Sequence, residues 1–184
     1  MSLRGDRLSQ LDRLRTEFDG SAYWQGRSEV FDIDALVTTQ DGNRWNDRGQ
    51  PTVYLTGDPG LTLIEAGRHI GGSADGGIDG VVWALRVEVA DILDLRRADV
   101  CKALGLDEPY WFLDRVGCQG LVGALRGTGA CAGILTQSAG LPDVPDRWNL
   151  VLFADRLSRP LSDIVSRPER LGSFRLAVSV PSGA

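Results

Sequence analysis

The chain has 184 residues, a length that suits one compact domain, and its 42% hydrophobic and 24% charged residues are ordinary values for a globular protein. This composition excludes a wholly disordered, collagen-like or coiled-coil chain. The formal net charge of −5 gives no overall field that attracts nucleic acid or an anionic membrane, so a phosphate-bearing ligand needs a local arginine site.

The sequence favours a reduced, cytoplasmic location. No apolar run reaches the roughly 18 residues of a membrane span, and the first residues contain no apolar signal core. Cys101, Cys118 and Cys131 are an odd set with wide gaps, which fits neither a disulfide framework nor a CxxC metal pattern. With His69 as the single histidine, we expect no metal site and no Ser-His-Asp triad.

Residues 6–18 place Leu8, Leu11, Leu14 and Phe18 at helical spacing, which predicts a short amphipathic helix. Two interpretations of this helix remain open: it packs on its own domain, or it faces a partner. The first is favoured because amphipathic helices usually face their own core. We divide the chain into an N-terminal helical lead, 1–20, and a single main domain, 21–184.

The middle of the chain begins with a polar, turn-rich segment at 41–51, followed by a predicted strand at 52–56. A helix is predicted from Pro59 to about Ile70, because Asp58 is a suitable N-cap and proline is tolerated at the first helical position. Residues 71–80 are glycine-rich and predict a loop. They do not form a Walker loop, because no GK[ST] follows.

The remaining elements alternate irregularly. Strands are predicted at 81–89, 131–135, 149–153 and 174–180, and helices at 97–104 and from 109 to about 125. In the second helix the expected core positions are Trp111, Phe112, Val116 and Val122. Strands and helices follow no steady βαβα order, so an α+β fold is favoured over a doubly wound sheet.

No single polar residue indicates a reaction by itself. Taken alone, Arg44 is an ordinary loop arginine, Tyr54 a core aromatic of a strand, Glu65 part of a solvated helix face and Ser138 a turn residue. Their spacing is more informative than their identities.

The run GNRWNDRGQPTVYLTGDPGLTLIEAGRH resembles the signature of RES-domain proteins. It carries Arg44-Trp45-Asn46, then Gly49, Tyr54, Glu65 and His69, with ten residues from Arg44 to Tyr54 and eleven from Tyr54 to Glu65. A second run, GILTQSAGLPDVPDRWNLVLF, resembles a later segment of the same family and places Ser138 at its serine and Asn149 at its asparagine. Together the two matches span about residues 42–155.

Two departures from the family pattern stand out. Gln137 precedes Ser138 where the family commonly has proline. Near the N-terminus the family often has an aromatic residue followed by arginine, whereas this chain reads Tyr23-Trp24-Gln25-Gly26-Arg27. Either Arg27 takes the place of that arginine or the feature is missing.

The resemblance implies an ADP-ribosyltransferase-like fold, with a split β core and flanking helices. It implies cleavage of NAD as substrate, with no further cofactor and no metal. It also implies a toxin of a bacterial toxin–antitoxin pair, neutralised by an antitoxin with an Xre-type DNA-binding domain. On this basis Glu65, Arg44 and Ser138 are the expected catalytic residues, and Arg44, Tyr54, Ser138, Asn149 and Arg27 the expected substrate-binding residues.

These residue types suit that chemistry. Breaking the nicotinamide–ribose bond passes through an oxocarbenium-like state, which a carboxylate such as that of Glu65 can stabilise. A guanidinium such as that of Arg44 matches a pyrophosphate, and Tyr54 can stack on a ring. Ser138 can hydrogen-bond a ribose or phosphate, and Asn149 can orient the site.

Several alternatives stay open at this stage. His69 either orients Glu65, which lies one helical turn earlier, or hydrogen-bonds a carbonyl. The acceptor of the ADP-ribose is water, phosphate or a protein, and a protein acceptor would make the chain a protein ADP-ribosyltransferase. The chain is otherwise a catalytically silent, partner-binding module of the same fold.

Overall fold

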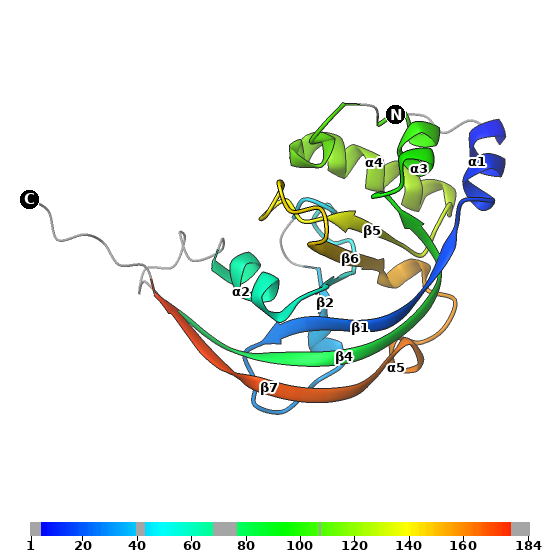
Figure 1. The fold of residues 1–184 in the computed structure, drawn as a ribbon. Helices are drawn as coiled ribbons and strands as arrows, with labels where there is room; N and C mark the ends of the chain where they lie inside the picture. Colours follow the sequence, from blue (N-terminus) through cyan, green and yellow to red (C-terminus); the bar gives the residue numbers. More distant parts are fainter. Residues whose placement is uncertain (1–4, 40–42, 68–76, 107, 178–184) are drawn as a thin grey trace, which may run out of the picture.

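The computed structural model describes residues 5–39, 43–67, 77–106 and 108–177, which form a curved β structure with flanking helices (Figure 1). The strands are β1 (Thr16–Gly26), β2 (Val37–Thr38), β3 (Thr52–Thr56), β4 (Gly77–Asp94), β5 (Gly133–Gln137), β6 (Trp148–Phe153) and β7 (Val165–Ala177). The α-helices are α1 (Gly5–Asp12), α2 (Pro59–Gly67), α3 (Ala98–Leu104), α4 (Arg115–Thr128) and α5 (Leu161–Ile164). Short 3-10 helices are η1 (Asp34–Leu36), η3 (Trp111–Leu113) and η4 (Ala154–Arg156). This mixture confirms the predicted α+β class.

Three long strands form one layer of the β structure. β4 is its central strand and pairs antiparallel with β1 on one edge and with β7 on the other. The β1–β4 register runs from Thr16↔Ile92 to Gly26↔Val81, so nearly the whole of β1 is paired along this edge. Figure 1 shows these three strands curving together beneath the rest of the molecule.

The four shorter strands form a second layer in the order β2–β3–β6–β5, with antiparallel pairing throughout. The layers join at two places. At one, the last residues of β4 pair in parallel with β5, from Ile92↔Gly133 to Asp94↔Leu135. At the other, β1 meets β3 through a single pair, Tyr23↔Thr56. The β core is therefore closed firmly on one side and barely joined on the other.

Side chains of the four-stranded layer alternate between two cores, as the two-residue period of a strand requires. Val53 and Leu55 of β3 and Leu150 of β6 face the three-stranded layer. Tyr54 and Val151 face the opposite way, toward α3 and α4. Full burial of each such aliphatic side chain contributes about 1.5–3 kcal/mol. The same alternation decides which polar side chains of this layer share a face.

The N-terminal helix is shorter than the sequence predicts. It ends at Asp12, and Phe18 lies in β1, where it pairs with Val89 and contacts the Trp148 ring edge-on at 5.4 Å. The helical spacing of the apolar residues continues as far as Phe18, but pairing with β4 makes this residue part of a strand. Leu11 is fully buried and Leu14 packs on the same core, so the helix packs on its own domain.

Four further expectations need correction. The helix predicted from residue 109 begins only at Arg115, because residues 111–113 form η3 and Asp114 caps α4. Residues 77–80, predicted as part of a loop, begin β4 and pair with the end of β7.

Val116 was expected in the core of α4, but 77% of its surface is exposed, and the buried stripe of the helix is formed by Cys118, Leu121, Val122 and Leu125. β7 begins at Val165, well before the strand predicted from residue 174. None of the helices in the described part of the chain has the length and apolar character needed to cross a bilayer.

Candidate active site

A cavity of about 580 Å³ lies beside the weakly joined edge of the β core. Strands β1 and β3, helix α2, the segment before β3 and the first residue of α4 contribute to its walls. Four predicted site residues line it, namely Arg44, Tyr54, Glu65 and Asn149. Ser138 adjoins it through its contact with Glu65.

A carboxylate held by two side chains stands at one end of this cavity. Glu65 Oε1 accepts hydrogen bonds from Ser138 Oγ at 2.9 Å and from Asn149 Nδ2 at 3.3 Å. Ser138 is fully buried, and its hydroxyl also accepts the Gly140 amide at 3.0 Å. Two donors fix the direction of a half-buried carboxylate, so its charge is preorganised toward the cavity.

The register of β3, β6 and β5 brings these residues together. Thr56 of β3 pairs with Asn149 of β6, which in turn pairs with Thr136 of β5. Asn149 therefore lies on the same face as Tyr54, toward α4. Ser138 follows directly after β5, and its amide donates to Arg147 O at 2.8 Å. Strand pairing thus joins segments that lie far apart in the sequence.

The carbonyl oxygen of the Asn149 amide is a buried, unsatisfied acceptor. Asn149 Oδ1 has no hydrogen-bond partner within the described residues. Leaving such a group unpaired costs about 1–3 kcal/mol. Because Asn149 lines the cavity, a ligand donor could satisfy this oxygen.

The start of helix α2, which carries Glu65, is held in place by a cap and an ion pair. Asp58 caps the helix by accepting the Leu61 amide at 3.1 Å, and Pro59 opens it, as the sequence predicts. Asp58 also forms an ion pair with Arg147. Although burial raises the pKa of Asp58, the hydrogen bonds from Arg147 and Leu61 hold it below its usual value.

Buried hydroxyls tie the same helix to the sheet. Thr62 of α2 and Thr56 of β3 share a hydrogen bond of 2.5 Å between their Oγ1 atoms. The helix was predicted to about Ile70; the described part ends at Gly67, and residues 68–76, including His69, lie outside the described residues. Capping, ion pairing and this hydroxyl contact together hold Glu65 against the sheet.

Tyr54 is fixed by the motif that precedes it. Its hydroxyl donates to Asn46 Oδ1 at 2.6 Å, and the same oxygen accepts the Asn43 amide at 3.2 Å. Gln119 of α4 donates to Asn43 O at 2.7 Å and so fastens the segment to the helix. Burial raises the pKa of Tyr54 well above its usual range, so the hydroxyl stays protonated as a donor.

Arg44 connects the cavity to the start of α4. Its Nη1 donates to Phe112 O at 3.0 Å and to Leu113 O at 2.6 Å. The nearby Cys118 is a weak candidate nucleophile, since burial raises the pKa of its thiol to about 11. Arg44 therefore both lines the cavity and anchors η3.

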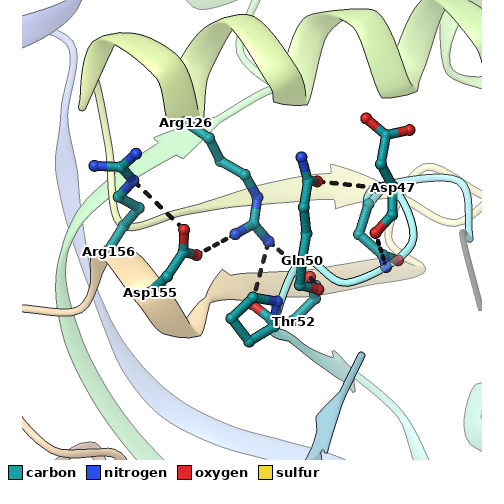
Figure 2. Close-up of polar contacts among 8 residues, drawn as sticks. Asp47, Gln50, Thr52, Arg126, Asp155 and Arg156 are labelled. Carbon is teal, nitrogen blue, oxygen red and sulfur yellow. Dashed lines mark hydrogen bonds and ion pairs between the residues drawn. The ribbon is translucent and has the colours of Figure 1, made fainter. Parts of the chain in front are cut away.

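Behind this arrangement, a buried arginine fixes the beginning of β3. Arg126 of α4, 3% exposed, forms an ion pair with Asp155 and donates to Thr52 Oγ1 at 2.6 Å and to Pro51 O at 3.3 Å (Figure 2). Its guanidinium also lies 4.3 Å from the centre of the Phe153 ring. Figure 2 shows the neighbouring turn, in which the Asp47 amide donates to Gln50 Oε1 at 2.9 Å.

Arg27 stands apart from the other predicted site residues. It is exposed and lines a second cavity of about 590 Å³. Trp24, Gln25, Thr38 and Tyr54 line both cavities, so the two adjoin. Arg27 can contact only a ligand that extends into the second cavity.

The cavity also contains residues that sequence reasoning did not single out. Tyr23 of β1, Thr62 of α2 and Arg115 of α4 line it. Asn46 stands inside the recognised motif and was given no role. Arg115 lies inside the helix predicted from residue 109, and only the structure shows that the helix begins at this residue. Within the described residues, no group of three or more His, Cys, Asp or Glu side chains is arranged to hold a metal ion.

Comparison with known proteins identifies a family and a similar solved structure. The family profile of the RES domain matches residues 13–173. A chain of the crystal structure of the M. tuberculosis MbcT–MbcA toxin–antitoxin complex is similar with a TM-score of 0.62 and 20% identity, covering 96% of this chain and 94% of that chain. A search of curated proteins finds no match. The structural likeness confirms the predicted fold class, a split β core with flanking helices.

Proposed function

The chain belongs to the RES-domain family, and we propose that it is the toxin of a toxin–antitoxin pair that cleaves the nicotinamide–ribose bond of NAD. One observation carries the proposal: Glu65 is held by Ser138 and Asn149 at the end of a cavity that also presents Arg44. A fixed carboxylate and a guanidinium on one cavity match a substrate with a cationic end and an anionic middle.

The reaction follows from these charges. The bond between ribose C1′ and the nicotinamide nitrogen breaks, and its electron pair goes to that nitrogen, which loses its positive charge. Positive charge then develops on the ribose, as in glycoside cleavage. Glu65 stabilises this charge, and the two hydrogen bonds to its Oε1 keep the carboxylate from turning away. A nucleophile adds to C1′ and completes the exchange.

Other cavity residues supply binding. The unsatisfied Asn149 Oδ1 is suited to accept a ribose hydroxyl, because both groups gain a hydrogen bond. Arg44 is suited to a phosphate oxygen, and Tyr54 offers a ring edge or face beside it. Ser138 acts through Glu65, and its position supports the expected catalytic set of Arg44, Glu65 and Ser138.

The proposal includes an antitoxin of Xre type as the protein partner and the cytoplasm as the site of action, where NAD is available. The similar solved structure is a toxin–antitoxin complex, which supports such a partner. A helix-turn-helix protein encoded next to this chain would be the partner to test. Co-expression should then restore growth that this chain alone suppresses.

The direct test is release of nicotinamide from NAD by the purified protein, measured with and without phosphate. Turnover without phosphate indicates a glycohydrolase, and turnover only with phosphate indicates a phosphorylase. Labelled protein with little free ADP-ribose indicates a protein ADP-ribosyltransferase. Glu65→Gln keeps an acceptor for both hydrogen bonds and removes the charge, so it should abolish release, as should Glu65→Ala. Equal release by wild type and these variants would sink the proposal; Glu17→Gln, exposed on β1, is the control.

A further inference from the structure

Arg115 is a second arginine on the cavity that the family motif does not include. It is the first residue of α4, it is exposed, and it lines the cavity together with Arg44. These two residues and Glu65 are the charged side chains among the described residues that line this cavity. The charge pattern is therefore two guanidiniums and one carboxylate.

The two arginines are mechanically connected. Arg44 Nη1 donates to Phe112 O and Leu113 O, which lie three and two residues before Arg115. Asp114, between them, caps α4 by accepting the Val116 amide at 3.1 Å. The backbone that carries Arg115 is thus fixed on one side by Arg44 and on the other by the helix cap. This arrangement fixes the backbone from which Arg115 reaches the cavity.

The charge of Arg115 is felt inside the cavity. Burial raises the pKa of Tyr54, while the positive charges of Arg126 and Arg115 act in the opposite direction. Arg126 is buried behind the strand, whereas Arg115 stands on the cavity wall. Arg44, Tyr54 and Arg115 line the same cavity, so an anion bound between the two arginines shares that cavity with Tyr54.

We propose that Arg115 is a substrate-binding residue that, with Arg44, holds the diphosphate of NAD. This inference rests on the proposed function, because NAD is the ligand whose diphosphate it binds. Guanidinium forks bind phosphate oxygens in pairs, so two arginines on one wall suit a group with two phosphates. The diphosphate then lies at the arginine wall and the nicotinamide ribose at Glu65.

The test measures binding and turnover separately. ADP, which carries the diphosphate and lacks nicotinamide, is titrated calorimetrically into wild type, Arg115→Gln and Arg115→Lys. Loss of charge-assisted hydrogen bonds predicts about 10- to 100-fold weaker ADP binding in Arg115→Gln. The ADP affinity of Arg115→Lys should lie between those of wild type and Arg115→Gln, because lysine keeps the positive charge and loses the paired hydrogen bonds of the guanidinium. Arg13→Gln, at an exposed position that does not line the cavity, should bind ADP as wild type does.

Turnover supplies the second arm. Arg115→Gln should raise the KM for NAD by a similar factor and leave the KM for nicotinamide riboside, which has no phosphate, unchanged. Unaltered ADP affinity in Arg115→Gln overturns the inference. A substitution that changes only the KM for inorganic phosphate as co-substrate, and not the KM for NAD, also overturns it. If wild type binds ADP through Arg115 but releases no nicotinamide, the diphosphate site stands and the proposed function fails. The exposed position of Arg115 keeps the variant folded, which a thermal melt checks.

Discussion

Ser138 Oγ donates a hydrogen bond of 2.9 Å to Glu65 Oε1, although the two residues are separated by 73 positions in the chain. The contact joins the end of β5 to helix α2 and is completed by Asn149 from β6. Helix α2, the end of β5 and strand β6 each contribute one of the three side chains. The Glu65 carboxylate is therefore placed correctly only when the three segments keep these relative positions. The predictions below test this dependence and the stability of the elements behind it.

Removing the serine hydroxyl should slow the reaction without unfolding the protein. In Ser138→Ala, Glu65 loses its closer donor and can turn within the cavity. We expect kcat for nicotinamide release to fall about tenfold, less than the roughly 10²–10³-fold effect of a donor acting directly on the transition state. Steady-state kinetics measure this, with Ser162→Ala at an exposed position as the control. An unchanged kcat would mean that Ser138 does not position Glu65.

Gly140 should tolerate no side chain if the catalytic group is to stay in place. A Cβ there would lie 3.2 Å from Glu65 Oε1 and 3.3 Å from Ser138 Oγ, closer than ordinary contact. We expect Gly140→Ala to lower kcat by about tenfold, as the same loss of positioning does in the serine variant. The free energy of unfolding, measured with denaturant, should be affected less than kcat, because Gly140 lies outside the two cores.

The opposite outcome is expected for Gly120, an exposed residue within α4. Apart from its chain neighbours and the backbone of its own helix, no atom lies within 4 Å of a Cβ added there. Alanine should raise the free energy of unfolding by about 0.5–1 kcal/mol, because it restricts the unfolded chain and favours the helix. Nicotinamide release by Gly120→Ala should match wild type, which makes it a matched glycine control for Gly140→Ala. A decrease in stability would contradict the helical environment described for this residue.

The buried Arg126 and its partner Asp155 should respond unequally to substitution. Asp155→Ala leaves a buried guanidinium without its carboxylate, which is expected to cost about 3–5 kcal/mol. Arg126→Met keeps much of the volume and leaves only a partly exposed carboxylate, so the loss should be smaller, about 2 kcal/mol. Urea unfolding of both variants measures the order. The reverse order would show that packing of the arginine outweighs compensation of its charge.

The Asp58–Arg147 ion pair predicts a defined acid response. Because the folded protein holds the pKa of Asp58 below its usual value of 3.8, this group stabilises the fold above that value, and its contribution is lost as pH falls through the folded pKa. Asp58→Asn keeps a capping side chain and removes the charge. The difference in unfolding free energy between wild type and this variant should be largest near pH 7. It should begin to shrink as the pH falls to about 3.8 and disappear below the lower pKa of the folded protein. A pH-independent difference would exclude the ion pair as its cause.

Local signals predicted some elements well. The strand over 52–56 and the start of α2 at Pro59 follow from a β-branched run and from proline after a capping aspartate. β1 could not be predicted in this way, because its first residues continue a helical spacing and the strand forms through pairing with the distant strand β4. The first part of β7 was likewise not predicted, because this charged stretch becomes a strand through pairing with the edge of β4.

The candidate site divides along the same line. The spacing of the family motif pointed to Arg44, Tyr54, Glu65, Ser138 and Asn149, and four of them line one cavity with Ser138 in contact with Glu65. Arg27 was predicted from its neighbourhood in sequence, but it follows the end of β1 and lines the adjoining cavity. Arg115 was missed, because it lies within the helix predicted from residue 109 and outside the family motif, and helical spacing does not show which residue faces a cavity.

The single pair between Tyr23 and Thr56 affects which groups a ligand meets beside β1. On its edge away from β4, β1 has only this one sheet partner in the described chain, and Trp24 and Gln25 just beyond it line both cavities. A strand edge left open offers main-chain donors and acceptors to whatever enters. Such groups persist through any side-chain substitution. A ligand in either cavity therefore meets main-chain groups along this edge of β1 whichever side chains flank it.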